Sequence, residues 1–354
     1  MRAVVFKGVR NVAVENRPKP KLQLPSDAII RISVSALCGS DLHWYRGHQK
    51  IPTGFIPGHE FVGIVEELGS EVDGVQIGDL VVATFSTQCG KCFYCERHQT
   101  SRCTDSFLFG NSIGETSIDG GQAEYVRVPQ ASSTLIKAPT NIPERLLVLM
   151  GDIFPTGYFC ASRFLKILTP EAARQTTVSV IGCGPVGICA IASTLTWCDT
   201  VFAVDIVPDR LAEAERLGAK PLLLTENPTA AIKAATEGRG ADVALEVVGT
   251  PESLQLCLDM VRPFGSISSV GLQTKDLVLH GPSLYAKNVT IAWGRCPVRG
   301  IFEDALACLV QVQDKVSFLC NDIMSMEDAP AAYDLFDQRK VHKVLLAPEA
   351  FCRL

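Results

Sequence analysis

The sequence predicts an α/β protein of two domains, a β-rich domain followed by a doubly wound parallel sheet. The chain has 354 residues, whereas single hydrophobic cores stop growing at about 250–300 residues. Short β-like segments punctuated by glycine and proline fill roughly the first 150 residues. From Thr176 the pattern changes to apolar strands that alternate with amphipathic helices, the order expected of a parallel sheet.

The first domain is predicted to be mostly antiparallel, because its strands are short and follow one another closely. The expected strands are 28–34, 63–67, 79–83 and 123–128. In the second domain the apolar runs are nearly continuous, which indicates strands covered on both faces. Its expected strands are 177–181, 201–205, 241–248, 266–270 and 289–293, and its expected helices are 188–195, 208–218 and 253–261.

The last segment lacks a partner of its own, and we expect its helical stretch and the strand at 343–346 to return to the first domain. The predicted division is therefore 1–155 together with 300–354, and 156–299.

Composition excludes several classes of protein. Hydrophobic residues make up 47% of the chain and charged residues 20%, which is globular composition. The formal net charge of −5 provides no basic field for nucleic acid. No run of about 18 uncharged apolar residues predicts a membrane span, and the N-terminus returns to charge too soon for a signal peptide. We therefore expect a cytoplasmic protein, whose 14 cysteines are metal ligands and buried small residues rather than disulfides.

Four closely spaced cysteines predict a structural zinc site. Short turns can bring four such thiolates to the corners of a tetrahedron, and a closed four-sulfur site is structural rather than catalytic. The alternative is two local disulfides or unconnected thiols. The four residues are Cys89, Cys92, Cys95 and Cys103.

A second group offers the ligand types of a catalytic zinc. Cys38 supplies a thiolate, His59 an imidazole and Glu60 a carboxylate, and a catalytic site keeps one position open for substrate. Taken alone, each of these residues is also compatible with ordinary packing.

A glycine-rich turn between a predicted strand and a predicted helix indicates dinucleotide binding. Glycine lets the backbone approach a pyrophosphate, and the helix N-terminus faces its negative charge. Asp205 ends the next strand, where a carboxylate accepts hydrogen bonds from ribose hydroxyls and repels a 2′-phosphate, so NAD is favoured over NADP. The turn contains Gly182, Gly184, Pro185, Val186 and Gly187.

With these three elements in this order, the chain resembles the zinc-containing medium-chain alcohol dehydrogenases from end to end. The resemblance implies a first domain related to the co-chaperonin β-barrel, a Rossmann second domain, an active site between them and two zinc ions per chain. It implies hydride transfer between NAD(H) and a small alcohol or its carbonyl compound.

The resemblance also assigns roles to individual residues. Cys38 and His59 match zinc ligands, and Glu60 matches a glutamate that can approach the metal. Asp41 matches the carboxylate that orients the ligating histidine. Ser40 matches the hydroxyl that faces the substrate oxygen, and His43 a histidine that completes a proton relay.

Asp152 stands where many family members have a cysteine as the third zinc ligand. The pattern Asp-x-x-Pro-Thr-Gly-Tyr resembles the glutathione-independent formaldehyde dehydrogenase branch, in which aspartate is the ligand. Formaldehyde itself is not implied, because the chain lacks the longer insertions of the bacterial enzyme. The competing interpretation is that Asp152 only caps a helix.

Further cofactor contacts follow from resemblance alone. Arg210 matches a cation near the adenosine ribose, Lys343 a basic residue near the pyrophosphate, and Val270 a residue at the end of a sheet strand beside the cofactor. The family also implies a homo-oligomer, with a tetramer favoured over a dimer.

Three rival functions remain. The first is a metal-free, NADPH-dependent enone or quinone reductase, against which Cys38, His59 and Asp205 argue. The second is a zinc-binding relic without turnover, with Asp152 as the degenerate position. The third is a zinc-ribbon protein that binds nucleic acid, which the net negative charge of the chain disfavours. The sequence does not identify the substrate, since the aromatic residues near the expected cleft (Trp44, Tyr45, Phe55, Phe107 and Phe109) are equally consistent with packing.

Overall fold

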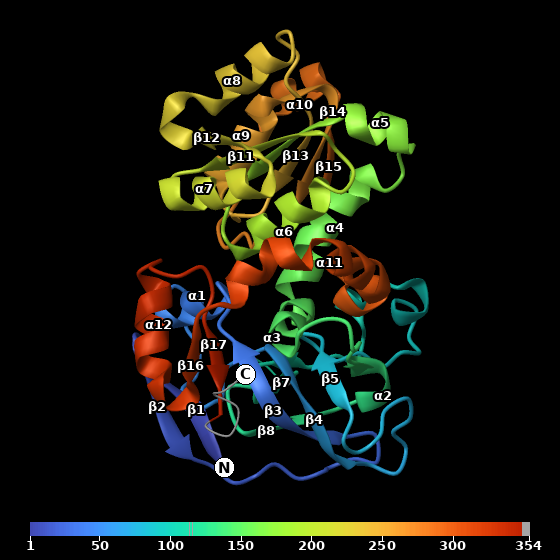
Figure 1. The fold of residues 1–354 in the computed structure, drawn as a ribbon, viewed down its shortest axis with the longest axis vertical. Helices are drawn as coiled ribbons and strands as arrows, with labels where there is room; N and C mark the ends of the chain where they lie inside the picture. The colour runs from blue at the N-terminus through green and yellow to red at the C-terminus, as the bar shows by residue number, and fades with distance from the viewer. Residues whose placement is uncertain (113, 115, 349–354) are drawn as a thin grey trace. The chain divides into compact units, whose positions relative to one another are not determined.

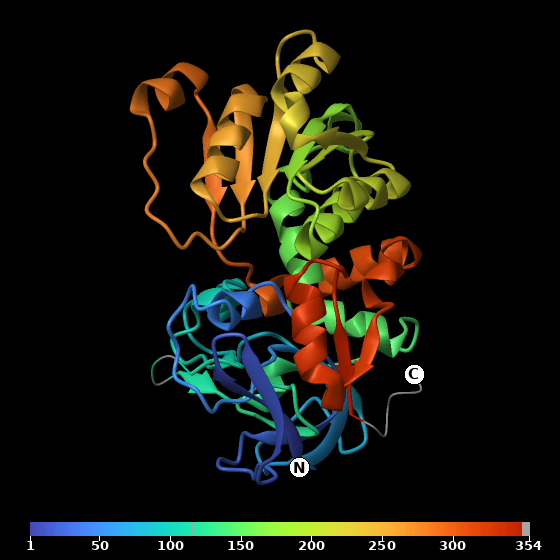
Figure 2. The ribbon, with the colours of Figure 1, turned by 90° about the vertical axis from the view of Figure 1, so that its left-hand side faces the viewer.

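The computed structural model describes residues 1–112, 114 and 116–348, which form two compact units. Unit 1 comprises Met1–Asp152, Pro297–Phe302 and the part from Ser317 onward, and unit 2 comprises Ile153–Cys296 and Glu303–Val316. Figures 1 and 2 show the elements of each unit. Within the described residues, no helix is both long enough and apolar enough to span a bilayer.

Unit 1 is built on a mostly antiparallel sheet, as the sequence predicts. Its strand order in the described chain is β16-β17-β3-β4-β5-β9, and β8 pairs with β3 (Figure 1). The strands are β3 (Ala28–Ala36), β4 (Glu60–Leu68), β5 (Leu80–Ala83), β8 (Tyr125–Val128), β9 (Leu135–Lys137), β16 (Ile323–Ser325) and β17 (Leu345–Ala347). Two separate two-stranded sheets accompany it: an antiparallel hairpin of β1 (Arg2–Gly8) and β2 (Asn11–Asn16), and a short parallel pair of β6 (Leu108–Phe109) and β7 (Ser117–Ile118).

The helices of unit 1 are short: α1 (Asp41–Tyr45), α2 (Ala131–Thr134), α3 (Glu144–Leu147) and α12 (Ala329–Asp337). The buried face of α12 joins α1 and the hairpin in one hydrophobic cluster, in which Tyr45 and Tyr333 have ring centroids 5.1 Å apart. The polar edges of α1 and α12 are tied by hydrogen bonds, for example from the Tyr45 hydroxyl to Asp334 at 2.7 Å. The C-terminal segment therefore fixes the position of the loop that follows β3.

Unit 2 has the doubly wound fold that the sequence predicts. Its parallel strands have the order β12-β11-β10-β13-β14-β15 in the described residues, and helices cover both faces (Figure 2). The strands are β10 (Thr177–Ile181), β11 (Thr200–Asp205), β12 (Lys220–Leu223), β13 (Ala241–Glu246), β14 (Val261–Ser269) and β15 (Thr290–Trp293).

The helices of unit 2 begin and end at recognisable residues. Helix α9 starts with a capping box between Thr250 and Ser253, and α7 ends at Gly218, whose φ of 113° suits glycine. The helices are α4 (Ile153–Leu165), α5 (Pro170–Gln175), α6 (Pro185–Thr194), α7 (Pro208–Leu217), α8 (Pro228–Ala235), α9 (Pro251–Met260), α10 (Gly281–Lys287) and α11 (Phe302–Val316).

One part of the predicted division is wrong. The strand expected at 343–346 does return to unit 1, where β17 pairs with β3, but residues 303–316 of α11 lie with unit 2. Cys308 of α11 is hydrogen-bonded to Ser193, and Asp304 pairs with Lys166 at 2.6 Å. The sequence predicted a helical stretch in this segment without showing which of the two cores would cover it.

Candidate active site

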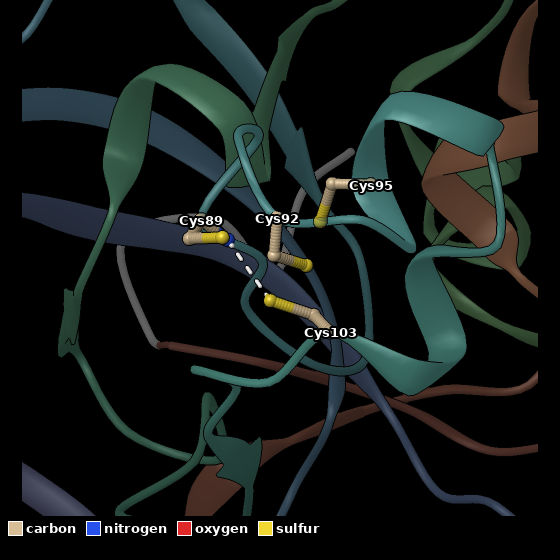
Figure 3. Close-up of side chains that lie close together, drawn as sticks. All are labelled: Cys89, Cys92, Cys95 and Cys103. Atoms are coloured by element: carbon tan, nitrogen blue, oxygen red, sulfur yellow. Dashed lines mark hydrogen bonds between the residues drawn. The ribbon is translucent and has the colours of Figure 1, made fainter.

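The four predicted structural ligands converge in one loop of unit 1. The sulfur atoms of Cys89, Cys92, Cys95 and Cys103 all lie within 4.8 Å of one another. Figure 3 shows the four side chains pointing toward a common centre. A tetrahedral zinc with Zn–S bonds of about 2.3 Å places its sulfurs roughly 3.8 Å apart, so the donor set fits a closed zinc site.

Backbone N–H groups donate to two of these sulfur atoms, those of Cys103 and Cys92. The amide of Cys89 donates to the Cys103 sulfur at 3.2 Å. Backbone hydrogen bonds from Thr104 and Cys95 lower the pKa of the Cys92 thiol to about 6. Such donors favour the thiolate, which is the form that binds zinc.

The cysteine lobe also anchors the segment that re-enters unit 1 at 297–302. The amide of Gly300 donates to the Thr100 hydroxyl at 3.2 Å. A Cβ at position 300 would lie 2.0 Å from the carbonyl oxygen of His98, so the approach requires glycine. If the loop that carries the four cysteines unfolds, the segment at 297–302 is therefore expected to lose its contacts with Thr100 and His98.

The second predicted metal group also comes together. Cys38, His59, Glu60 and Asp152 each place one ligand atom within 4.8 Å of the others. Cys38 follows β3 and His59 precedes β4, and the pairing of Ala36 with Glu60 brings these two strand ends into contact. Asp152 reaches the same place because the amide of Phe85, next to β5, binds the carbonyl of Gly151 at 2.9 Å.

The distances within this cluster are those of a group prepared for a cation. The Cys38 sulfur lies 3.9 Å from Asp152 Oδ2, and His59 Nε2 lies 3.5 Å from the same oxygen. A thiolate, an imidazole and a carboxylate oxygen are all normal zinc donors. Asp152 therefore lies where the predicted third ligand must lie.

His59 is oriented by a neighbour on the other side of its ring. Its Nδ1 lies 3.6 Å from Asp41 Oδ1, while its Nε2 faces the ligand cluster. The second oxygen of Asp41 accepts a hydrogen bond from the Cys38 amide at 3.0 Å. One carboxylate thus positions two of the candidate ligands, as the predicted role of Asp41 requires.

The electrostatics of the cluster also favour a cation. Burial raises the pKa of the Cys38 thiol, and the nearby Glu60 raises it further. Burial alone lowers the pKa of His59, but Cys38 and Asp152 raise it well above its usual value. Glu60 Oε1 has no hydrogen-bond partner among the described residues. A thiol and two carboxylates that lie this close together repel one another when ionised, and a divalent metal ion would offset their charge.

Ser40 adjoins this cluster, and His43 lies three residues further along the chain, in α1. The Ser40 hydroxyl is exposed and lies 3.4 Å from His59 Nε2, and it does not cap α1. His43 is half-buried, and burial, His48 and Arg46 together lower its pKa. Both side chains are therefore available for proton transfer.

Lys343 has a partner that sequence reasoning missed. Its ammonium is 1% exposed and lies 2.7 Å from Glu60 Oε2, so its position lends no support to the predicted pyrophosphate contact, which stays untested. The signal in the sequence was a single lysine that directly precedes an apolar strand.

The glycine turn of unit 2 has the form that pyrophosphate binding needs. Gly182 has a φ of 98°, and a Cβ at Gly187 would lie 1.9 Å from the Gly182 carbonyl oxygen. Pro185 opens α6, followed by Val186, and Gly184 precedes the helix without a side-chain cap. The first amides of α6 are thus free of a capping side chain and point to an anion site.

Asp205 both ends β11 and braces this turn. Its Oδ2 accepts from the Cys183 amide and its Oδ1 from the Ile206 amide, each at 2.7 Å. A carboxylate oxygen has lone pairs left for a ribose hydroxyl. Arg210 lies beside the same turn, since a Cβ at Gly184 would be 3.8 Å from its Nη1.

Glu246 is a further residue that sequence reasoning missed. It ends β13 and is fully buried, and its Oε1 accepts from the amides of Val248 and Gly249 at 2.8 and 2.7 Å. Its Oε2 accepts from Ser269 at 2.7 Å, and its carbonyl from the Val270 amide at 3.0 Å. Glu246 thus holds the loops after β13 and β14, including the predicted cofactor residue Val270.

The aromatic residues near the predicted cleft prove to be mostly packing residues. Trp44, Tyr45 and Phe55 belong to the cluster formed with α12, and Phe109 packs edge-on against Phe61 with ring centroids 5.1 Å apart. They therefore do not identify a substrate pocket.

Comparison with known proteins agrees with this geometry. Residues 24–140 match the alcohol dehydrogenase GroES-like domain, and residues 185–311 match the zinc-binding dehydrogenase family. The zinc-type alcohol dehydrogenase B of Aspergillus flavus is 46% identical over 349 residues, which cover 98% of this chain and 81% of the relative. The glutathione-independent formaldehyde dehydrogenase of Pseudomonas aeruginosa is 31% identical over 399 residues, which cover 99% and 98%.

A solved structure shows the same similarity at the level of the fold. The alcohol dehydrogenase TADH from a Thermus species has a TM-score of 0.92 and 36% sequence identity. The match covers 99% of this chain and 100% of the Thermus protein.

We predict that Cys95→Ser removes one zinc ion per chain and lowers Tm by roughly 5–10 °C, the shift expected for a loss of about 3 kcal/mol in a domain of this size. Inductively coupled plasma spectrometry and a thermal melt measure both effects. The control is Cys198→Ser, a buried cysteine of unit 2 outside both clusters. A Cys95→Ser protein that keeps full zinc content contradicts the assignment.

We predict that Asp152→Ala also removes one zinc ion per chain and lowers kcat/KM at least about 100-fold, because the metal loses an anionic ligand. Asp152→Cys restores a thiolate donor and is expected to keep the metal. Asp73→Ala, at an exposed aspartate of the same unit, should change neither quantity. Full activity and metal content in Asp152→Ala would show that Asp152 only caps a helix.

Proposed function

The chain belongs to the zinc-dependent medium-chain alcohol dehydrogenases, and we propose that it oxidises a small alcohol to its carbonyl compound with NAD as the hydride acceptor. The carrying observation is the convergence of Cys38, His59 and Asp152 on one point beside an exposed serine. The reverse reduction uses the same groups.

Cys38, His59 and Asp152 would hold the catalytic zinc, and the glycine turn of unit 2 would hold the dinucleotide. When bound, zinc supplies Lewis acidity toward the alcohol oxygen and NAD accepts the hydride from carbon. The fit rests on the donor set and on the acceptor-rich surroundings of Glu60.

The remaining steps belong to the chain itself. Asp41 keeps His59 Nε2 turned toward the ligand cluster, because its carboxylate faces Nδ1. The Ser40 hydroxyl accepts the alcohol proton and passes its own proton toward solvent. His43 takes part in that transfer, since its lowered pKa keeps the imidazole neutral and able to accept a proton. Through these two residues the proton of the alcohol would reach water.

The choice of NAD rests on Asp205. Its carboxylate closes the edge of the glycine turn, where the 2′-phosphate of NADP would meet a negative charge. Arg210 beside the same turn favours the cofactor anion without distinguishing the two cofactors.

We also propose a cytoplasmic homotetramer, the oligomer that the family resemblance favours. Support for the compartment comes from the cysteines, since none of those in the described residues forms a disulfide. Size-exclusion chromatography with light scattering measures the oligomeric state, and a monomer would contradict the proposal.

The test is a screen of primary, secondary and aromatic alcohols with NAD and NADP, in which reduced cofactor is followed by absorbance. We expect NAD reduction with at least one alcohol class and loss of that activity when the catalytic zinc is removed by a chelator. A preparation with zinc in both clusters that neither binds NAD nor reduces it with any alcohol would favour the rival interpretation, a zinc-binding protein of the same fold without turnover.

We predict that Asp205→Asn raises the ratio of kcat/KM for NADP to that for NAD about 10–100-fold, because the substitution removes the charge that repels a 2′-phosphate. Asparagine has a single acceptor oxygen and keeps only one side of this arrangement, either the bond from Cys183 or the bonds from Ile206 and Val207, so a thermal melt checks that the variant still folds. The control is Asp199→Asn, an exposed aspartate just before β11. An unchanged cofactor ratio in Asp205→Asn would remove the basis for the NAD preference.

A further inference from the structure

Arg163 is a half-buried cation of unit 2 whose hydrogen bonds end on two neighbouring strands. It lies in the last turn of α4, and its Nη1 donates to the Ser268 hydroxyl at 3.3 Å and to the Ser269 carbonyl at 3.2 Å. Nη1 also reaches the Ala292 carbonyl at 3.0 Å, and Nη2 reaches the Gly294 carbonyl at 3.2 Å. The two serines end β14, whereas Ala292 belongs to β15 and Gly294 directly follows it. One side chain therefore joins the carboxyl ends of both strands.

A guanidinium suits this position because of the arrangement of its donors. It carries five N–H groups in one plane, so it can bond oxygens from two strands at once. The ring of Phe159 lies beneath it, with the ring centroid 4.0 Å from the guanidinium carbon. Burial lowers the pKa of Arg163, and its four oxygen partners are all uncharged. Holding a cation partly out of water without a carboxylate costs free energy, which indicates that the bonds to the strand ends are what this arginine contributes.

The strand end that Arg163 holds is also tied to β13. The Ser269 hydroxyl donates to Glu246 Oε2 at 2.7 Å, and Glu246 Oε1 accepts from two backbone amides of the loop after β13. The Ser269 carbonyl, which Arg163 binds, also accepts from the Gly294 amide at 3.1 Å. Arg163, Ser269 and Glu246 thus connect the loops that follow β13, β14 and β15.

These three loops belong to the half of the sheet that does not carry the glycine turn. The strand order β12-β11-β10-β13-β14-β15 reverses its direction of growth between β10 and β13. The glycine turn follows β10, and Asp205, the proposed partner of the adenosine ribose, ends β11. A doubly wound sheet binds a dinucleotide across this reversal, with one nucleotide on each half. The loops that Arg163 connects therefore belong to the half that receives the nicotinamide nucleotide.

We propose that Arg163 is a positioning residue that shapes the binding site for the nicotinamide half of the cofactor, by holding the loops after β14 and β15 together. It acts through the backbone carbonyls of these loops, so its effect falls on the nicotinamide half and not on the adenosine half. The inference rests on the proposed function for the identity of the cofactor. It does not depend on which alcohol the enzyme uses.

The test compares the whole cofactor with its adenosine part and needs no turnover. The full zinc-loaded chain is titrated with NADH, followed by the fluorescence of the reduced nicotinamide, and with ADP, followed by isothermal titration calorimetry. We expect R163M to raise the Kd for NADH at least about tenfold and to leave the Kd for ADP within about twofold of the parent's, because only the nicotinamide site loses its preorganisation.

Two further variants control for charge and for substitution as such. R163K keeps the positive charge but loses the planar fork that spans both strand ends, so we expect it to raise the Kd for NADH roughly three- to tenfold and to bind ADP as the parent does. R174M replaces an exposed arginine of α5 in the same unit and should change neither Kd. A thermal melt of each variant shows whether it folds.

Three results would overturn the inference: parental NADH binding in R163M, an equal loss of NADH and ADP binding in R163M, or parental NADH binding in R163K. If R163M does not fold, R163K decides. Failure of both variants to fold would assign Arg163 to the stability of unit 2 alone and would also overturn the inference. A parent that binds neither NADH nor ADP would contradict the proposed cofactor, and this inference would fall with it. The parent titration separates that result from a failure of Arg163 alone.

Discussion

The catalytic half of this protein depends on one electrostatic constraint, which is that several acidic groups lie together out of water. Cys38, Glu60 and Asp152 share a space only a few ångströms across, and Asp41 adjoins them through His59. Buried charges persist only when they are compensated. The fold meets this requirement with one lysine from the C-terminal segment and with a place for a divalent ion.

This constraint explains why so many distant segments meet at one place. The ends of β3 and β4 supply Cys38 and His59, the loop after α3 supplies Asp152, and the residue before β17 supplies Lys343. Helix α12 completes the arrangement by holding α1 through Tyr45 and Asp334. The C-terminal segment is therefore part of the site and not only a cover for the sheet.

The four-cysteine loop and the glycine turn form through contacts between residues that are close in the sequence. Four thiols in a short loop need only turns and backbone amides to converge, and the amides that lower the pKa of Cys92 come from the same loop. The glycine turn is similar, because Gly182 and Gly187 permit its close approach within a few residues. Asp205 connects this local motif to the next strand by binding the Cys183 amide.

The sequence by itself determined the two-domain α/β fold through the periodicity of its apolar residues. It determined the four-cysteine site and the glycine turn because these depend on contacts between residues close in the chain. It also supplied the candidate ligands Cys38, His59, Glu60 and Asp152, without deciding among them. Only the tertiary structure placed α11 with unit 2 and Lys343 against Glu60. Asp304 of α11 contacts Lys166, which is 138 positions away, and the register of β17 on β3 brings Lys343 to Leu37, which is 306 positions away. The reason is physical: spacing along the chain records local geometry, whereas the partner of a buried charge is set by which strands pair.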